Sequence, residues 1–174
     1  MPRFAANLST LFTEYAFFDR FAAAAETGFA AVEIQFPYAF EKEQIASALT
    51  SNDLELVLHN LPPGNIAAGD RGLTCLPDRV DEFRQVVATA IEYATTLHCP
   101  RLNSLIGVPP EGCDGALVHE TLINNLRFAA SALAEAGLNL TIEPVNHFDN
   151  PGYLLNRSAD ALAVIEEVGA ANLT

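Results

Sequence analysis

One segment of the sequence combines a residue suited to acid–base chemistry with the position that such chemistry needs. Residues 140–149 read LTIEPVNHFD, so a short apolar run typical of a strand ends at Glu143, and Pro144 follows at once. Proline interrupts an ordinary strand ladder. Where parallel strands alternate with helices, functional residues gather at the C-terminal ends of the strands. Glu143 is therefore predicted to be a proton-transferring base or a metal ligand.

Three further polar residues occupy strand-like segments and are candidates for contact with a substrate. Asn7 ends the first such segment and is expected to reach the substrate. Glu33 alternates with Gln35, so both share one strand face, where a buried carboxylate needs a hydrogen bond. Glu33 is therefore expected either to bind substrate and surround the metal site or to belong to an interior polar layer without chemistry. His59 either hydrogen-bonds a substrate oxygen or is a core-edge histidine satisfied by the backbone.

These candidates are embedded in a regular alternation of strand-like and helix-like segments. The expected strands are residues 3–7, 30–36, 54–59, 101–106 and 138–143, and the expected helices are residues 14–27, 40–51, 78–97, 116–136 and 158–169. Ser158 is a candidate N-cap for the last helix. Alternation of this kind predicts βαβ units and a parallel sheet in an α/β protein.

The polar strand ends favour a (β/α)8 TIM barrel over an open sheet, because in a barrel they converge on one mouth. No glycine-rich phosphate-binding fingerprint follows an expected strand, which disfavours nucleotide binding. The chain has about five strand–helix units, where a full barrel has eight and about 250 residues. Residues 172–174 look like the start of a sixth strand. Residues 1–174 are therefore expected to form one incomplete barrel domain, truncated at the C-terminus.

A long loop is expected between residues 60 and 77. It contains Gly64, Gly69 and Gly72 together with three prolines. Loops of this length inside compact domains are usually functional or mobile. The loop is expected either to close over a substrate and exclude water or to be a static, self-packed loop.

The composition limits the classes of partner. Of 174 residues, 22 are acidic and 9 are basic, and the resulting net charge of −13 disfavours binding to nucleic-acid phosphates. No window is apolar for long enough to cross a bilayer, and the N-terminus lacks the apolar core of a secretion signal. The three cysteines show no CxxC spacing, which argues against a disulfide framework or a zinc knuckle and favours a cytoplasmic protein.

Five segments resemble hydroxypyruvate isomerases, and the resemblance runs in register through essentially the whole chain. They are residues 3–9 (RFAANLS), 32–38 (VEIQFPY), 58–64 (LHNLPPG), 67–72 (AAGDRG) and 142–152 (IEPVNHFDNPG), of which the last is the most specific. The wider group is the xylose-isomerase-like TIM barrels, which also includes endonuclease IV. A close neighbour, 2-oxo-tetronate isomerase, shares the opening segment, whereas residues 144–152 resemble hydroxypyruvate isomerase.

The resemblance implies an enzyme that interconverts hydroxypyruvate and 2-hydroxy-3-oxopropanoate (tartronate semialdehyde) by proton transfer through an enediolate. In this family two glutamates act as acid and base and help to hold a divalent metal. Glu143 matches the first glutamate, and Mg²⁺ or Mn²⁺ is the expected ion. The second glutamate and the other ligands lie on later strands of the family fold, beyond residue 174. The implied partner is a small hydroxy-oxo acid, which His59 is expected to contact.

Two other functional classes compete with this interpretation. The first is a non-catalytic barrel fragment, whose open strand edges and uncovered interior would need a second copy of the chain or another partner. The second is a DNA-repair endonuclease of the same superfamily, which the acidic composition and the lack of a basic stripe disfavour.

Overall fold

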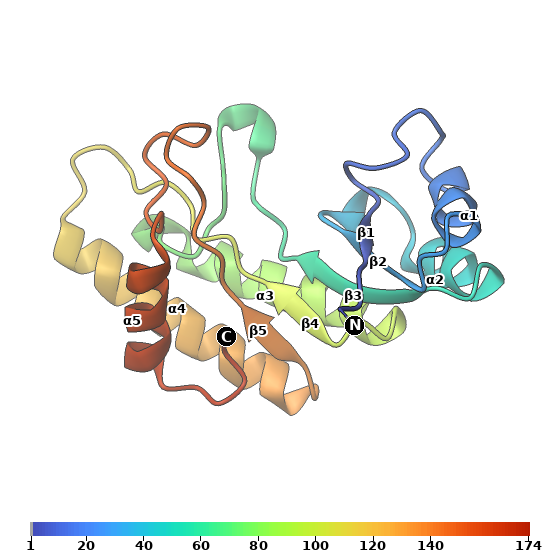
Figure 1. Ribbon diagram of the computed structural model, residues 1–174. Helices are drawn as coiled ribbons and strands as arrows, with labels where there is room; N and C mark the ends of the chain where they lie inside the picture. Colours follow the sequence, from blue (N-terminus) through green and yellow to red (C-terminus); the bar gives the residue numbers. More distant parts are fainter. Residues whose placement is uncertain (1) are drawn as a thin grey trace.

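The computed structural model describes residues 2–174, and its centre is a curved parallel sheet (Figure 1). The strands are β1 (Ala6–Asn7), β2 (Ala31–Ile34), β3 (Glu55–Asn60), β4 (Arg101–Asn103) and β5 (Asn139–Thr141), paired in the order β1-β2-β3-β4-β5. A parallel bridge between Leu140 and Leu173 adds the last residues as a further neighbour of β5. The strands follow one another in chain order, without the reversal of an open doubly wound sheet. This order and the parallel pairing confirm the predicted α/β class. The bridge to Leu173 confirms the predicted start of a sixth strand.

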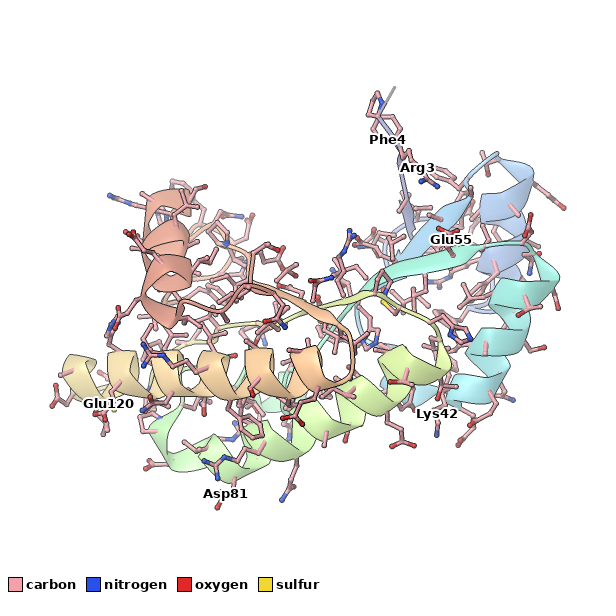
Figure 2. The ribbon with its side chains drawn as sticks, turned by 90° about the horizontal axis from the view of Figure 1, so that it is seen from below. Arg3, Phe4, Lys42, Glu55, Asp81 and Glu120 are labelled. Carbon is pink, nitrogen blue, oxygen red and sulfur yellow. The ribbon has the colours of Figure 1, made fainter. Side chains whose placement is uncertain are left out.

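Helices connect successive strands and cover one side of the sheet. They are α1 (Asp19–Glu26), α2 (Lys42–Ser51), α3 (Val80–Thr96), α4 (Gly115–Glu135) and α5 (Ser158–Val168), with short 3-10 helices η1 (Pro37–Ala39), η2 (Ile66–Ala68) and η3 (Pro77–Arg79). Figure 1 shows the loops that follow β1, β3, β4 and β5 rising from the same edge of the sheet. Figure 2, the view from below, shows α2, α3 and α4 along the outer side of the strands. Within residues 2–174, no helix has the length and apolar character of a membrane span.

The core lies between the strands and the helices because each helix presents one apolar stripe to the sheet. The apolar stripe of α4 is buried, and its members include Leu122, Leu126, Ala129, Ala130 and Leu133. On α3 the buried members are Phe83, Val87, Ala90 and Ala94. The spacing of three to four residues matches the helical period. This packing fixes the strands and therefore the side chains at their ends.

The first helix is shorter than its apolar spacing predicts. The pattern of residues 14–27 predicts one helix, but α1 begins only at Asp19. Phe12 adopts a left-handed φ of 59°, and the chain between it and Asp19 runs through turns. Phe17 stacks on Phe40 with ring centroids 4.1 Å apart. The prediction is wrong for residues 14–18, where packing between elements rather than helical periodicity positions the aromatic side chains.

The start of the last helix and the end of the fourth strand also differ from the predicted positions. The predicted N-cap Ser158 is wrong by one residue, because Arg157 is the N-cap and Ser158 is already helical. The strand expected over residues 101–106 ends at Asn103. Beyond it, Ile106 forms an antiparallel bridge with Gly72 of the long loop, so the chain leaves the parallel ladder.

Candidate active site

Polar side chains from five neighbouring strands gather at the carboxyl edge of the sheet. Asn7 ends β1, Glu33 lies in β2, Asn60 ends β3, and Asn103 ends β4. Glu143 follows the end of β5 by two residues. The register pairs Asn7 with Glu33 and Asn60 with Asn103, which places these residues at matching levels. The structure therefore brings three predicted site residues, from β1, β2 and the end of β5, to one mouth.

A buried asparagine positions the Glu143 carboxylate. Asn103 Nδ2 donates hydrogen bonds to Glu143 Oε1 and to Asn60 Oδ1, each at 3.0 Å. Asn103 is 3% exposed, so a side chain fixed in the core holds the carboxylate. Within residues 2–174, no other side chain forms a hydrogen bond with Glu143, which leaves Oε2 open for a proton or a cation.

Glu33 brings a second carboxylate to the mouth. Asn7 Nδ2 donates to Glu33 Oε1, while Asn7 Oδ1 accepts a 2.9 Å hydrogen bond from the Ser9 amide. Burial raises the pKa of Glu33, the negative charge of Glu143 raises it further, and the hydrogen bond from Asn7 opposes both effects. The protonated form of Glu33 is therefore more favourable here than in a solvent-exposed glutamate.

We expect the pKa of the Glu33 carboxyl to lie above the ordinary value of 4.5 and to fall when Glu143→Gln removes the neighbouring charge. Because the burial of Glu33 remains, its pKa returns only part of the way. A carbon-detected NMR titration of the glutamate carboxyls measures both values. Glu120→Gln is the matched control, since Glu120 lies on the outer helix α4 (Figure 2). An unchanged Glu33 pKa in Glu143→Gln contradicts the electrostatic contact.

A cavity of about 270 Å³ opens beside Glu143 at this mouth. Its polar lining comes from the loops after β2, β3 and β5 and includes Gln35, Asn60, Arg71 and Tyr153. The volume lies just under the range of about 300–1,000 Å³ typical of pockets for drug-sized ligands, so the cavity suits a compact metabolite. A larger hollow of about 460 Å³ lies among residues of the opposite edge, where none of the predicted site residues lies.

Tyr153 is a cavity residue that the sequence did not single out. Its ring is buried, and its hydroxyl oxygen accepts a 2.8 Å hydrogen bond from the Ile106 amide. Burial raises the pKa of Tyr153 to about 12, so its hydroxyl stays protonated at neutral pH. The phenol therefore ties the loop after β5 to the loop after β4 and retains its proton for donation.

The loop after β3 is anchored in its second half. Thr74 Oγ1 lies 2.8 Å from Ser104 Oγ and donates to the Leu105 carbonyl at 2.7 Å. Asn125 Nδ2 of α4 donates to the Thr74 carbonyl at 2.9 Å. Residues 72–76 are buried, whereas residues 65–69 and Arg71 are exposed. Of the two expected behaviours, the static one therefore holds for residues 72–76, and closure over a substrate stays a prediction for the exposed tip.

His59 lies away from the cavity. Neighbouring strand residues face opposite sides, and Asn60 takes the side of the mouth. His59 Nδ1 instead lies 3.2 Å from the Tyr38 hydroxyl, and the Tyr38 ring packs edge-on against Tyr93 of α3. Within residues 2–174, His59 Nε2 is buried without a hydrogen-bond partner. This placement fits the core-edge alternative, and substrate contact by His59 stays a prediction without support from its position.

Burial lowers the pKa of His59 to about 4, below its usual 6.5. The stability linked to neutral His59 is present above pH 6.5 and is lost as the pH falls towards about 4. We expect the free energy of unfolding to fall with decreasing pH more steeply in the wild type than in His59→Gln, by up to about 1.4 kcal/mol per pH unit. Urea titrations across this window measure the slopes. Equal slopes in the wild type and His59→Gln refute the prediction.

The described residues do not form a metal site by themselves. Within residues 2–174, no three histidine, cysteine, aspartate or glutamate side chains come together in a metal-binding arrangement. Glu143 offers one open oxygen, and Glu33 already accepts a hydrogen bond from Asn7. A single carboxylate is one ligand of the six or more oxygen atoms that Mg²⁺ or Ca²⁺ takes. Residues 2–174 therefore do not supply a complete set of ligands for a metal ion.

The chain is similar to several known proteins in sequence and in structure. Hydroxypyruvate isomerase of Escherichia coli (strain K12) is 49% identical over 99% of this chain and 67% of that protein. The 2-oxo-tetronate isomerase of Cupriavidus necator is 48% identical over 99% of this chain and 66% of that protein. A crystal structure described as an AP endonuclease of family 2 from Brucella melitensis is 43% identical, with a TM-score of 0.97 over 100% of this chain and 67% of that one.

The chain therefore spans about two thirds of the length of the curated relatives that it matches. The family described as xylose isomerase-like TIM barrel matches residues 21–174, which include β2 to β5 and Glu143. Sequence identity and the chain-ordered parallel sheet both agree with the resemblance. On these grounds the chain belongs to the xylose isomerase-like TIM barrel family.

Proposed function

We propose that the carboxyl edge of this sheet is the acid–base part of an isomerase site that interconverts hydroxypyruvate and 2-hydroxy-3-oxopropanoate. The observation that carries the proposal is Glu143, which Asn103 holds beside the cavity at the carboxyl edge of the sheet. The names of the relatives at 49% and 48% identity support an isomerase acting on a small hydroxy-oxo acid.

The reaction moves a proton between adjacent carbons, and Glu143 is the proposed base. It takes a proton from C3 of hydroxypyruvate, which leaves an enediolate across C2 and C3. Protonation at C2 then gives the aldehyde, while the hydroxyl proton of C3 passes to the oxygen on C2. A positioned base of this kind typically contributes about 10²- to 10⁴-fold. Tyr153, whose oxygen accepts from Ile106, keeps its proton for the oxygen that becomes negative.

Asn7 and Glu33 complete the proposed contacts on the β1–β2 side of the mouth. Their mutual hydrogen bond fixes the Glu33 carboxylate, which can accept a hydrogen bond from a substrate hydroxyl. Burial and the negative charge of Glu143 raise the pKa of Glu33, which favours its protonated form. These two residues therefore orient the substrate for proton transfer in the proposal.

Exchange of substrate hydrogens with solvent tests the proposed function. The full-length protein expressed from its complete gene, and the 174-residue chain beside it, are incubated with hydroxypyruvate in deuterated water. Formation of the aldehyde together with deuterium at the reacting carbon supports isomerisation through an enediolate. If only the full-length protein is active, the 174 residues by themselves are a non-catalytic part of it. If neither protein turns over hydroxypyruvate, the proposal is rejected.

The 2-oxo-tetronate isomerases provide the alternative substrate. Relatives with this name are 48% and 43% identical to the chain, close to the hydroxypyruvate isomerase at 49%, so identity does not separate the two activities. Both substrates share the 2-oxo acid group and differ in length. The ratio of kcat/KM for hydroxypyruvate and 2-oxo-tetronate decides between them.

A divalent metal, Mg²⁺ or Mn²⁺, remains a proposal that rests on the family resemblance. Glu143 Oε2 fits as one oxygen ligand, and a bound cation would polarise a substrate carbonyl. The complete ligand set is not present in residues 2–174. Dialysis of the full-length protein against a chelator, followed by addition of each ion, tests metal dependence of the isomerisation.

Nucleic-acid binding is not part of the proposal, although the Brucella melitensis structure is described as an AP endonuclease. The net charge of −13 opposes contact with a phosphate backbone. A mobility-shift assay with abasic DNA tests this directly.

We also propose a cytoplasmic location, which cell fractionation tests. We further propose that a second copy of the chain associates through the open sheet edges, which analytical ultracentrifugation tests.

A further inference from the structure

The cavity beside Glu143 contains one positively charged side chain. Among its lining residues, the charged ones are Asp70, Arg71 and Glu143. Glu33 in β2 adds a further carboxylate at the mouth, held by its hydrogen bond from Asn7. An anionic substrate approaching these carboxylates meets repulsion, which a cation at the cavity wall offsets. Arg71 is the residue positioned to provide it.

Asp70 forms its ion pair with Arg79, and the nearby charge of Arg71 also lowers the pKa of Asp70 without a salt bridge between the two. Arg79 Nη1 donates to Asp70 Oδ1 at 2.7 Å, and the Asn65 amide donates to Asp70 Oδ2. Arg79 itself forms two 2.7 Å hydrogen bonds with Glu82 at the start of α3. Within residues 2–174, no carboxylate forms an ion pair with Arg71. The positive charge of Arg71 is therefore available to a ligand.

The backbone holds Arg71 at a defined place in the loop. Arg71 Nη1 donates to the carbonyl oxygen of Asp70 at 2.8 Å and lies 3.4 Å from that of Ile66. The next residue, Gly72, donates to the Pro63 carbonyl at 3.0 Å and pairs with Ile106. Two main-chain carbonyls thus engage one nitrogen of the guanidinium, while the anchored Gly72 fixes its point of attachment. The other nitrogens remain for hydrogen bonding.

We propose that Arg71 binds the carboxylate of the substrate and selects 2-oxo and 2-hydroxy acids over uncharged analogues. The proposal rests on the proposed function, in which the substrate is a small hydroxy-oxo acid. A guanidinium matches the two oxygens of a carboxylate in a planar, bidentate geometry. Anchoring the carboxylate at Arg71 orients the reacting carbons towards Glu143, which lines the same cavity.

The test compares Arg71→Gln and Arg71→Lys with the wild type in the full-length protein. Glycerate serves as the binding probe because it carries the carboxylate and lacks the reacting carbonyl, and glycerol is its uncharged counterpart. We expect Arg71→Gln to weaken glycerate binding and to raise KM for hydroxypyruvate by about 10- to 100-fold, with a smaller change in kcat. Arg71→Lys restores part of the binding, since it keeps the charge and loses the bidentate geometry.

Arg84→Gln is the matched control, since Arg84 lies on α3 and is paired only loosely with Asp81, at 3.8 Å. It leaves glycerate binding unchanged. Wild-type affinity for glycerate in Arg71→Gln overturns the proposal, as does equal loss of affinity for glycerol and glycerate. If the wild type binds glycerate through Arg71 but does not isomerise hydroxypyruvate, the carboxylate site stands and the proposed function fails.

Discussion

Glu143→Gln is expected to lower kcat for hydroxypyruvate isomerisation by about 10³-fold in the full-length protein. Glutamine keeps the size of the side chain and an oxygen that accepts from Asn103, so the local geometry survives. The neutral amide cannot take a proton from carbon. Steady-state kinetics with purified protein measure the loss, and the thermal midpoint shows whether the fold is retained.

Two comparisons make the Glu143 result specific. Glu120→Gln removes the same charge from an exposed site on α4 and keeps wild-type kcat. Asn103→Leu leaves the carboxylate in place and removes its donor, so kcat falls by less than in Glu143→Gln. Near-normal turnover by Glu143→Gln would falsify the assignment of Glu143 as the base.

Gly72→Ala is expected to lower the free energy of unfolding by about 3 kcal/mol. Gly72 has a φ of +121°, and a Cβ at this position would collide with the Leu105 carbonyl oxygen. Alanine therefore meets both an unfavourable backbone conformation and a clash with main-chain atoms that cannot rotate away. Because Gly72 pairs with Ile106, the substitution also detaches the loop that carries Arg71.

Gly69→Ala separates these two causes. Gly69 also has a positive φ, +101°, but a Cβ there meets no atom within 4 Å. The variant is expected to lose only about 1 kcal/mol, the cost of the backbone conformation alone. Urea unfolding monitored by circular dichroism gives both values. Equal losses of stability in the two variants would show that the clash with the Leu105 main chain adds nothing to the cost of the backbone conformation.

Much of the architecture and the position of Glu143, the proposed base, follow from local sequence patterns. Strand-like runs between amphipathic segments predict a parallel α/β sheet, and the observed strands fall within or at the edges of the expected ranges. Glu143 is recognisable because a carboxylate followed by proline ends such a run. Asn7 and Glu33 share the mouth because parallel pairing in register carries neighbouring strand ends to the same edge.

The remaining parts of the site depend on contacts between distant segments. Asn103 lies inside a strand expected over residues 101–106, and only the bridge from Ile106 to Gly72 shows that the strand stops at Asn103. Tyr153 and Arg71 reach the cavity through loop conformations that no periodic pattern encodes. The sequence also does not show which of His59 and Asn60 faces the mouth at the end of β3. A shift of one residue in the strand register would exchange the sides that these two side chains face.

The backbone of Ile106 connects three loops of the mouth. Its amide donates to Tyr153 from the loop after β5, its carbonyl accepts from the Cys75 amide in the loop after β3 at 3.1 Å, and the residue itself belongs to the loop after β4. These loops therefore cannot fluctuate independently. A ligand that orders one of them also reduces the freedom of the other two, so the entropic cost of ordering is shared among the loops. Affinity at the cavity then depends on main-chain groups of a residue whose own side chain is buried in the core.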